Sequence, residues 1–260
     1  MAIVAPSATA GTAAAVEPGD PFLFLEFAWV DAATIQAKVA ASAPTTAARI
    51  LMFDSSGDLK WFSFTGTQSI AITTDGVNGL ETVCLNAEGE ETDHNYHVYA
   101  VGKADGTVGF ILTDTDDFSA GPFTGWSMPT GYTYCSAPAW YVRNDGSGNI
   151  MPFHGSGGLC TYLGTGNNLT VLLSGTATTY TDITAGLRVY VPEWATDCVL
   201  SAFIGDNEYA YITPDSTYDT IYLGPEMTST DVTYPANADL FYKKTSSGSS
   251  FNLWAPRWRR

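Results

Sequence analysis

Basic residues are scarce in this 260-residue sequence, which has 11 lysines and arginines against 27 aspartates and glutamates. A formal net charge of −16 repels nucleic acid and anionic lipid, so neither is an expected partner. The scarcity is uneven along the chain. The basic residues that follow the last acid, Asp239, are Lys243, Lys244, Arg257, Arg259 and Arg260.

Long apolar runs are also missing. No stretch reaches the roughly 18 consecutive apolar residues of a membrane helix, so we expect no membrane insertion. Residues 1–20 have neither the basic region nor the continuous apolar region of a signal peptide. They are rich in alanine and threonine and bury too little surface to fold alone, so we expect them to lie along a neighbouring subunit.

Cysteine is sparse, and its spacing argues against a zinc site. The four cysteines are far apart and form no CxxC pair. We expect them to be buried thiols, with a disulfide pair as the alternative. They are Cys84, Cys135, Cys160 and Cys198.

Histidine is sparser still. His94 and His97 stand three apart in a predicted strand, where side chains an odd number apart face opposite sides, and His154 is remote from both. The acidic loops 114–117 and 144–149 offer oxygen ligands but lack the complete EF-hand order, so ordinary turn chemistry is the better interpretation. No serine–histidine–acid order and no single pair of carboxylates stands out. We therefore expect no metal, no cofactor and no catalytic residue.

What the chain has in plenty is aromatic residues, glycine and threonine, which favour strands and tight turns. Short apolar runs at Tyr96–Val101, Val108–Leu112, Tyr132–Val142 and Ile150–Phe153 are each bounded by glycine, proline, aspartate or asparagine. Asn144–Asn149 predicts a hairpin turn between the last two runs. The spacing predicts an all-β fold: an antiparallel β-sandwich or jelly-roll-like body over residues 46–260 that ends in a basic tail.

Residues 1–45 are predicted to form an extended N-terminal arm for attachment. One short helix is expected within it, over Ala32–Ala41, because the segment is rich in alanine and spaces Ile35 and Val39 four apart. Asp31 is the expected N-cap. The alternative is that this segment supplies a first strand and helix of the body.

Aromatic side chains near the predicted loops supply the candidate binding residues. Sugars stack their C–H faces on aromatic rings, so a glycan platform is one interpretation, and a core or subunit-interface role is the other. The candidates are Trp126, Tyr132, Tyr134, Trp140 and Tyr141.

The C-terminal tail alternates aromatic and basic residues, a pattern suited to docking on an acidic neighbouring subunit. A solvated chain end is the alternative. The expected docking residues are Arg257, Trp258, Arg259 and Arg260.

Several of these segments together resemble a known group of proteins. The segments are His97–Ala100, Trp126–Tyr134, the hairpin Arg143–Ile150, Pro152–Phe153 and the predicted valine–proline strand Leu187–Pro192. In this order they resemble tailed-bacteriophage virion proteins of the tail-fibre-like group, over roughly residues 45–255. In place of the segment 135–138, such proteins more often have a basic, glycine-containing run.

The resemblance implies a virion structural protein, not an enzyme, in the tail or tail fibre. It also implies a homo-oligomer, trimer or higher, that contacts other virion proteins. The alternatives are a head-decoration protein, a carbohydrate-binding module that recognises a host surface glycan, and a sandwich-fold glycosidase.

Overall fold

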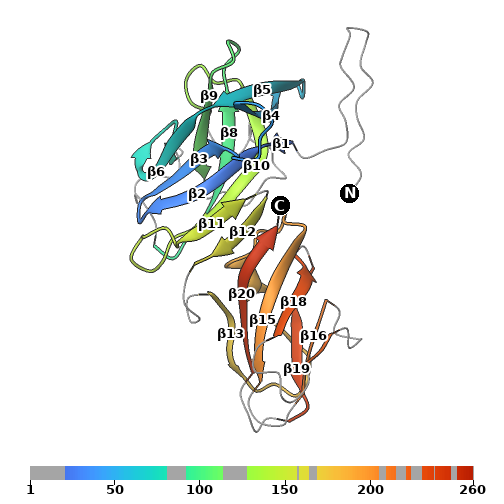
Figure 1. The fold of residues 1–260 in the computed structure, drawn as a ribbon. Coiled ribbons are helices and arrows are strands. Elements are labelled where there is room, and N and C mark those ends of the chain that lie inside the picture. Colours follow the sequence, from blue (N-terminus) through green and yellow to red (C-terminus); the bar gives the residue numbers. More distant parts are fainter. Residues whose placement is uncertain are drawn as a thin grey trace.

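The structure is a computed structural model that describes residues 21–80, 92–113, 128–156, 158–163, 169–204, 209–214, 221–223, 230–236, 238–246 and 251–259. The described chain is almost entirely β-strand, with one short helix, and its strands gather in two lobes (Figure 1). The predicted all-β, antiparallel, sandwich-type fold is therefore confirmed. No helix among the described residues is both long enough and apolar enough to cross a membrane.

The first lobe is a single curled sheet. Its hydrogen-bonded order is β4, β10, β8, β9, β7, β6, β3, β2, β11, β12, with β5 and β1 also paired to β4. All pairings are antiparallel except those of β7 with β6 and β9. In chain order the strands are β1 (Phe22–Leu23), β2 (Leu25–Asp31), β3 (Thr34–Val39), β4 (Ala47–Asp54), β5 (Leu59–Thr65), β6 (Thr67–Asp75), β7 (Gly79–Leu80), β8 (Asn95–Gly102), β9 (Val108–Thr113), β10 (Tyr134–Arg143), β11 (Phe153–Ser156) and β12 (Leu159–Tyr162).

The inner face of this sheet closes on an aromatic core. Phe27 of β2 meets Phe110 of β9 edge-on at 5.8 Å between ring centroids, and stacks on Trp140 of β10 at 5.4 Å. Phe64 of β5 also meets Phe110 edge-on. Strands from distant parts of the sheet thus share one interior.

The second lobe has two layers. Strands β13, β20, β15 and β18 form one layer, and the separate sheet β14–β19–β16–β17 forms the other. Tyr242 of β19 stacks on Phe251 of β20, with centroids 5.7 Å apart, and so joins the layers. The elements are β13 (Thr170–Gly175), β14 (Thr181–Asp182), α1 (Thr184–Arg188), β15 (Asp197–Ile204), β16 (Ala210–Thr213), β17 (Ile221–Leu223), β18 (Thr230–Pro235), β19 (Phe241–Lys244) and β20 (Phe251–Arg259).

One strand joins the lobes. β20 pairs with β15 within the second lobe, and its last residues also pair with β12 of the first lobe, where Trp258 lies opposite Cys160 (Figure 1). The Trp258 side chain is completely buried. Its ring centroid lies 5.0 Å from that of Trp140 and 5.4 Å from that of Trp194. A shared strand and an aromatic cluster therefore hold the lobes together.

Close packing next to this cluster requires a glycine. A Cβ atom on Gly155 of β11 would lie 2.3 Å from the Phe27 carbonyl oxygen and 2.7 Å from the Trp140 ring. Any side chain at this position would push β11 away from both.

The helix predicted for Ala32–Ala41 is wrong, because Thr34–Val39 is the central strand β3, paired with β2 and β6. Ile35 and Ala37 are fully buried two residues apart, and Ile35 and Val39 share a face of a strand as readily as of a helix. Hydrogen bonding on both sides overrides the helix propensity of alanine. Asp31 accepts the Ala33 N–H in the β2–β3 turn instead of capping a helix.

The sheet also changes the predicted domain boundary. Strands β1, β2 and β3 are integral to the first lobe, so the part of the predicted arm from Phe22 to Val39 belongs to the body. The predicted arm segment 1–20 lies outside the described residues.

The basic tail is likewise part of the body. Phe251–Arg259 is a paired strand of both lobes rather than a projecting end, and Trp258 has no exposed surface with which to dock on a neighbour. Arg257 is half-buried and Arg259 is exposed, while Arg260 lies outside the described residues.

The predicted strand Leu187–Pro192 is also wrong. It is the end of helix α1 followed by a turn, closed by hydrogen bonds from the Tyr190 and Val191 N–H groups to the Leu187 carbonyl oxygen. A Cβ atom on Gly186 would lie 2.4 Å from the Val171 carbonyl oxygen, so glycine lets the helix approach β13.

The expected burial of the cysteines is confirmed for the three that are described. Cys135, Cys160 and Cys198 are free thiols with no exposed surface. Burial, with the nearby Asp197 carboxylate, raises the pKa of the Cys198 thiol to about 12, and burial also raises the pKa of Cys135 and Cys160. These thiols are inert hydrophobic side chains rather than nucleophiles.

We predict that Trp258→Ala destabilises the protein by about 3–5 kcal/mol, because it empties the space between the lobes. The measurement is urea unfolding followed by circular dichroism. The control is Leu173→Ala, whose side chain is 65% exposed and whose loss should change stability by less than about 0.5 kcal/mol. Equal effects of the two substitutions would contradict the described junction.

We also predict an alkaline loss of stability that depends on Cys198. The folded state holds the thiol proton to about pH 12, whereas the unfolded chain releases it near the ordinary pKa of 9.0. The contribution of the buried thiol to the free energy of unfolding is therefore complete below pH 9.0. It falls between pH 9.0 and about pH 12, by at most about 1.4 kcal/mol per pH unit. Urea unfolding across this range should give a shallower decline for Cys198→Ala than for the wild type. Parallel declines would refute the prediction.

Candidate functional site

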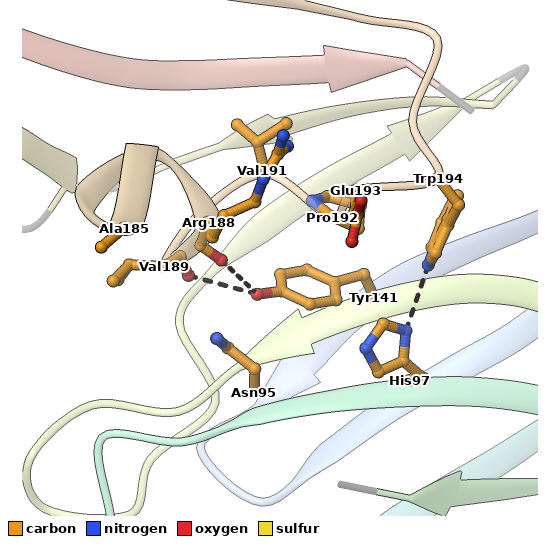
Figure 2. Close-up of a pocket in the computed structure, with 10 residues that line it drawn as sticks. All are labelled: Asn95, His97, Tyr141, Ala185, Arg188, Val189, Val191, Pro192, Glu193 and Trp194. Atoms are coloured by element: carbon orange, nitrogen blue, oxygen red, sulfur yellow. Dashed lines mark hydrogen bonds between the residues drawn. The ribbon is translucent and has the colours of Figure 1, made fainter. Parts of the chain in front are cut away.

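A pocket of about 260 Å³ lies where the two lobes meet. Its first wall is made by Asn95 and His97 of β8 and Tyr141 of β10, all from the first lobe. Its second wall is made by α1 and the segment that leads to Trp194, from the second lobe (Figure 2). Neither lobe forms the pocket by itself.

Tyr141 ties the two walls together. Its hydroxyl group donates toward the carbonyl oxygens of Arg188 and Val189, at 3.1 and 3.3 Å (Figure 2). The Tyr141 side chain is 2% exposed, so this hydroxyl forms its hydrogen bond in a largely dry environment. The contact fixes the end of α1 over β10.

His97 makes a second link between the walls. The Trp194 indole N–H donates to Nδ1 of His97 at 3.1 Å, which places the proton of the neutral imidazole on Nε2 (Figure 2). The His97 ring also meets the Tyr141 ring edge-on at 5.3 Å. The tautomer and orientation of this histidine are therefore set by side chains of both lobes.

Asn95 is oriented by a buried charge. The Arg143 guanidinium donates to Oδ1 of Asn95 at 3.1 Å and forms an ion pair with the Asp93 carboxylate. Arg143 is only 7% exposed and lies 5.6 Å from the Tyr190 ring centroid. Because the Asn95 oxygen is engaged, its NH₂ group is the end left to face the pocket.

A second pocket, of about 330 Å³, adjoins this network. Arg143, Tyr190 and the hairpin residue Asp145 are among its lining residues. Its lining neighbours that of the first pocket, because Arg143 bonds Asn95. Tyr162 of β12 donates to the Tyr190 carbonyl oxygen at 3.1 Å, which anchors this wall to the sheet. Burial raises the pKa of both tyrosines, so both remain neutral hydrogen-bonding groups.

The predicted hairpin turn is confirmed at the edge of the second pocket. Asn144 bridges to Ile150, and the Asp145 carboxylate accepts the Ser147 and Asn149 N–H groups at 2.9 and 3.0 Å. Burial acts to raise the pKa of the Asp145 carboxyl, but these hydrogen bonds outweigh it and the pKa is lowered. The carboxylate serves its own turn, as Asx chemistry predicts.

The structure does not gather the predicted aromatic platform. Trp140 and Tyr141 are 1% and 2% exposed, because the Trp140 ring packs against Phe27 and Trp258 and the Tyr141 hydroxyl group bonds the end of α1. Tyr132 and Tyr134 are half-buried, with the ammonium groups of Lys103 and Lys60 at 4.8 and 5.2 Å from their ring centroids. Trp126 lies outside the described residues.

Metal-binding residues are not clustered in the part of the chain that the structure describes. No group of three histidine, cysteine, aspartate or glutamate side chains there could hold a metal ion. His97 is committed to Trp194, and His154 is exposed on β11. The acidic loop 114–117 lies outside the described residues.

Sequence reasoning singled out His97 and Tyr141 separately, and it missed that they share a wall. It also missed Asn95, Glu193 and Trp194. A tryptophan in the loop segment Pro192-Glu193-Trp194 was the available signal, because loop aromatics often mark binding sites. Its partner could not be read from the sequence, since His97 is 97 positions away.

Comparisons with protein families, curated proteins and solved structures found no match to this chain. Its function is therefore inferred from its residues and geometry.

We predict that Tyr141→Phe destabilises the protein by about 1–2 kcal/mol, because two carbonyl oxygens lose a buried donor. Thermal unfolding measures the change. Tyr132→Phe is the matched control, since no hydrogen bond of its hydroxyl contributes to the contact between the lobes, and it should change stability by less than about 0.5 kcal/mol. If both variants unfold like the wild type, Tyr141 does not join the walls.

Proposed function

We propose that this protein is a structural component of a tailed-bacteriophage virion, in the tail or tail fibre, where it assembles as a symmetric homo-oligomer. The observation that carries the proposal is that three of the segments resembling such virion proteins, His97–Ala100, Arg143–Ile150 and Pro152–Phe153, lie together in the first lobe, whereas Leu187–Pro192 lies in the second. His97–Ala100 lies in β8, which pairs with β10, and β10 continues into the hairpin that closes at Ile150. These three segments of the resemblance therefore belong to one folded substructure.

The outward face of β4 and β5 supports the oligomer. Leu59 is 58% exposed and lies opposite Phe53, while Trp61 lies opposite Leu51 in the same antiparallel register. Arg49 stacks over the Trp61 ring, with its guanidinium carbon 4.7 Å from the centroid. Neighbouring apolar side chains on an open sheet face are typical of a surface that another molecule covers.

The position of β5 strengthens this support. Within the described chain β5 pairs only with β4, so its other edge offers backbone donors and acceptors beside the same apolar side chains. A second copy that covered this face would bury both. In an oligomer with closed symmetry, every copy covers such a surface on its neighbour, and no open fibre forms.

We predict that the purified protein elutes from a sizing column with light-scattering detection as a closed oligomer, trimer or higher. Leu59→Arg should shift it toward monomer, because a charge would enter the apolar contact, while circular dichroism stays unchanged. Leu173→Arg, an equally exposed substitution on β13, is the control and should leave the oligomer intact. A wild-type monomer at all concentrations would argue against the structural role.

Particle location separates the tail role from head decoration. Gold-labelled antibodies against the purified protein should mark the tail of intact particles. Labelling of the head would favour the decoration role, and no labelling would remove the virion proposal.

Carbohydrate recognition is a second candidate, favoured by the pocket between the lobes. An enzymatic role has no comparable support, since none of the described residues forms a recognisable catalytic arrangement.

A further inference from the structure

The pocket between the lobes has no role in the proposed assembly, yet its walls are built by specific contacts. Two hydrogen bonds link the lobes at the pocket, one from the Tyr141 hydroxyl group and one between Trp194 and His97, and they fix the position of its walls. Its chemistry therefore indicates what it accepts.

The walls of the pocket carry both hydrogen-bond donors and hydrogen-bond acceptors. Figure 2 shows the Asn95 side chain rising toward the Tyr141 hydroxyl group, and Glu193 on the opposite wall. With its oxygen held by Arg143, Asn95 presents an amide donor. Glu193 supplies an exposed carboxylate acceptor at the rim. Donors and acceptors on facing walls suit hydroxyl groups, which act as both.

Apolar surface lies between these polar groups. Val191 and Pro192 are buried and line the pocket together with half-buried Val189. The Trp194 and Tyr141 rings add aromatic surface. A ligand with C–H faces as well as hydroxyl groups would match both kinds of wall.

The guanidinium groups near the pocket are already held by other partners, which disfavours an anionic ligand. Arg143 is paired with Asp93. Arg188 turns its guanidinium to the carbonyl oxygens of Ala236 and Ala238. Glu193 and the formal net charge of −16 also repel a carboxylate or phosphate.

Size limits the ligand further. A volume of about 260 Å³ lies just below the usual range of about 300–1,000 Å³ for drug-sized ligands, so one small ring fits. The second pocket, whose lining residue Arg143 bonds Asn95 of the first, has a volume of about 330 Å³ and is large enough for a second ring.

We propose that the pocket between the lobes binds one uncharged pyranose unit of a glycan, with the next unit in the second pocket. The site deepens the carbohydrate-recognition candidate and does not depend on virion assembly. Binding by a monomeric protein would support this site while contradicting the oligomer, so the two proposals fail separately.

The test is saturation-transfer NMR of the full chain with glucose, galactose, mannose and N-acetylglucosamine, and with lactose and maltose. We expect at least one neutral sugar to bind with a dissociation constant of about 1 mM, and its disaccharide to bind more tightly. Glucuronate serves as an anionic probe and should bind more weakly. No signal with any sugar at about 50 mM, or binding of a charged probe alone, would overturn the proposal.

Variants place the bound sugar. Asn95→Ala should weaken binding about tenfold by removing a donor. Asn95→Ala also removes a hydrogen-bond partner of Arg143, so a second variant is needed. Ala185→Trp fills the pocket from an exposed position on α1 and removes no side-chain hydrogen bond. It should abolish binding. Tyr132→Ala, outside the pocket, should bind as the wild type does. Binding that survives Ala185→Trp, or is lost in Tyr132→Ala, would refute this site.

Discussion

The pairing of β20 with β12 is the constraint on which the rest of the structure depends. It makes the last described strand a member of both lobes, with Trp258 enclosed between Trp140 of the first and Trp194 of the second. The backbone hydrogen bonds between the two strands hold this junction, and burial of the Trp258 indole adds hydrophobic stabilisation. Because a strand fixes direction as well as distance, the walls of the pocket between the lobes are held at a defined separation.

A buried guanidinium stabilises the second part of that architecture. Removing the charge of Arg143 from water is unfavourable unless partners replace the lost hydration. Asp93, Asn95 and the Tyr190 ring provide them, and they come from two segments that are far apart in the chain. Satisfying one buried charge therefore orients the amide that faces one pocket and the tyrosine that lines the next.

Apolar runs bounded by turn-forming residues predicted the strands well. The runs that became β8, β9 and β10 were recognised, as was the hairpin in which Asp145 caps its own backbone. Sequence patterns failed for β3, where alanine content favoured a helix, and for α1, where a valine-rich segment favoured a strand. In both places the outcome depends on neighbouring strands that are distant in sequence.

The sequence by itself determined the fold class, since side-chain alternation and turn residues act within a few positions. It also determined that the cysteines suit a packed interior better than a metal site. Only the tertiary structure decided which aromatic residues are exposed and which are buried. Trp140, Tyr141 and Trp258 each lie within three positions of an arginine, which suggests a surface, yet pairing between distant strands covers them. The pocket arose in the same way, because His97 and Trp194 meet only after two lobes have folded around one shared strand.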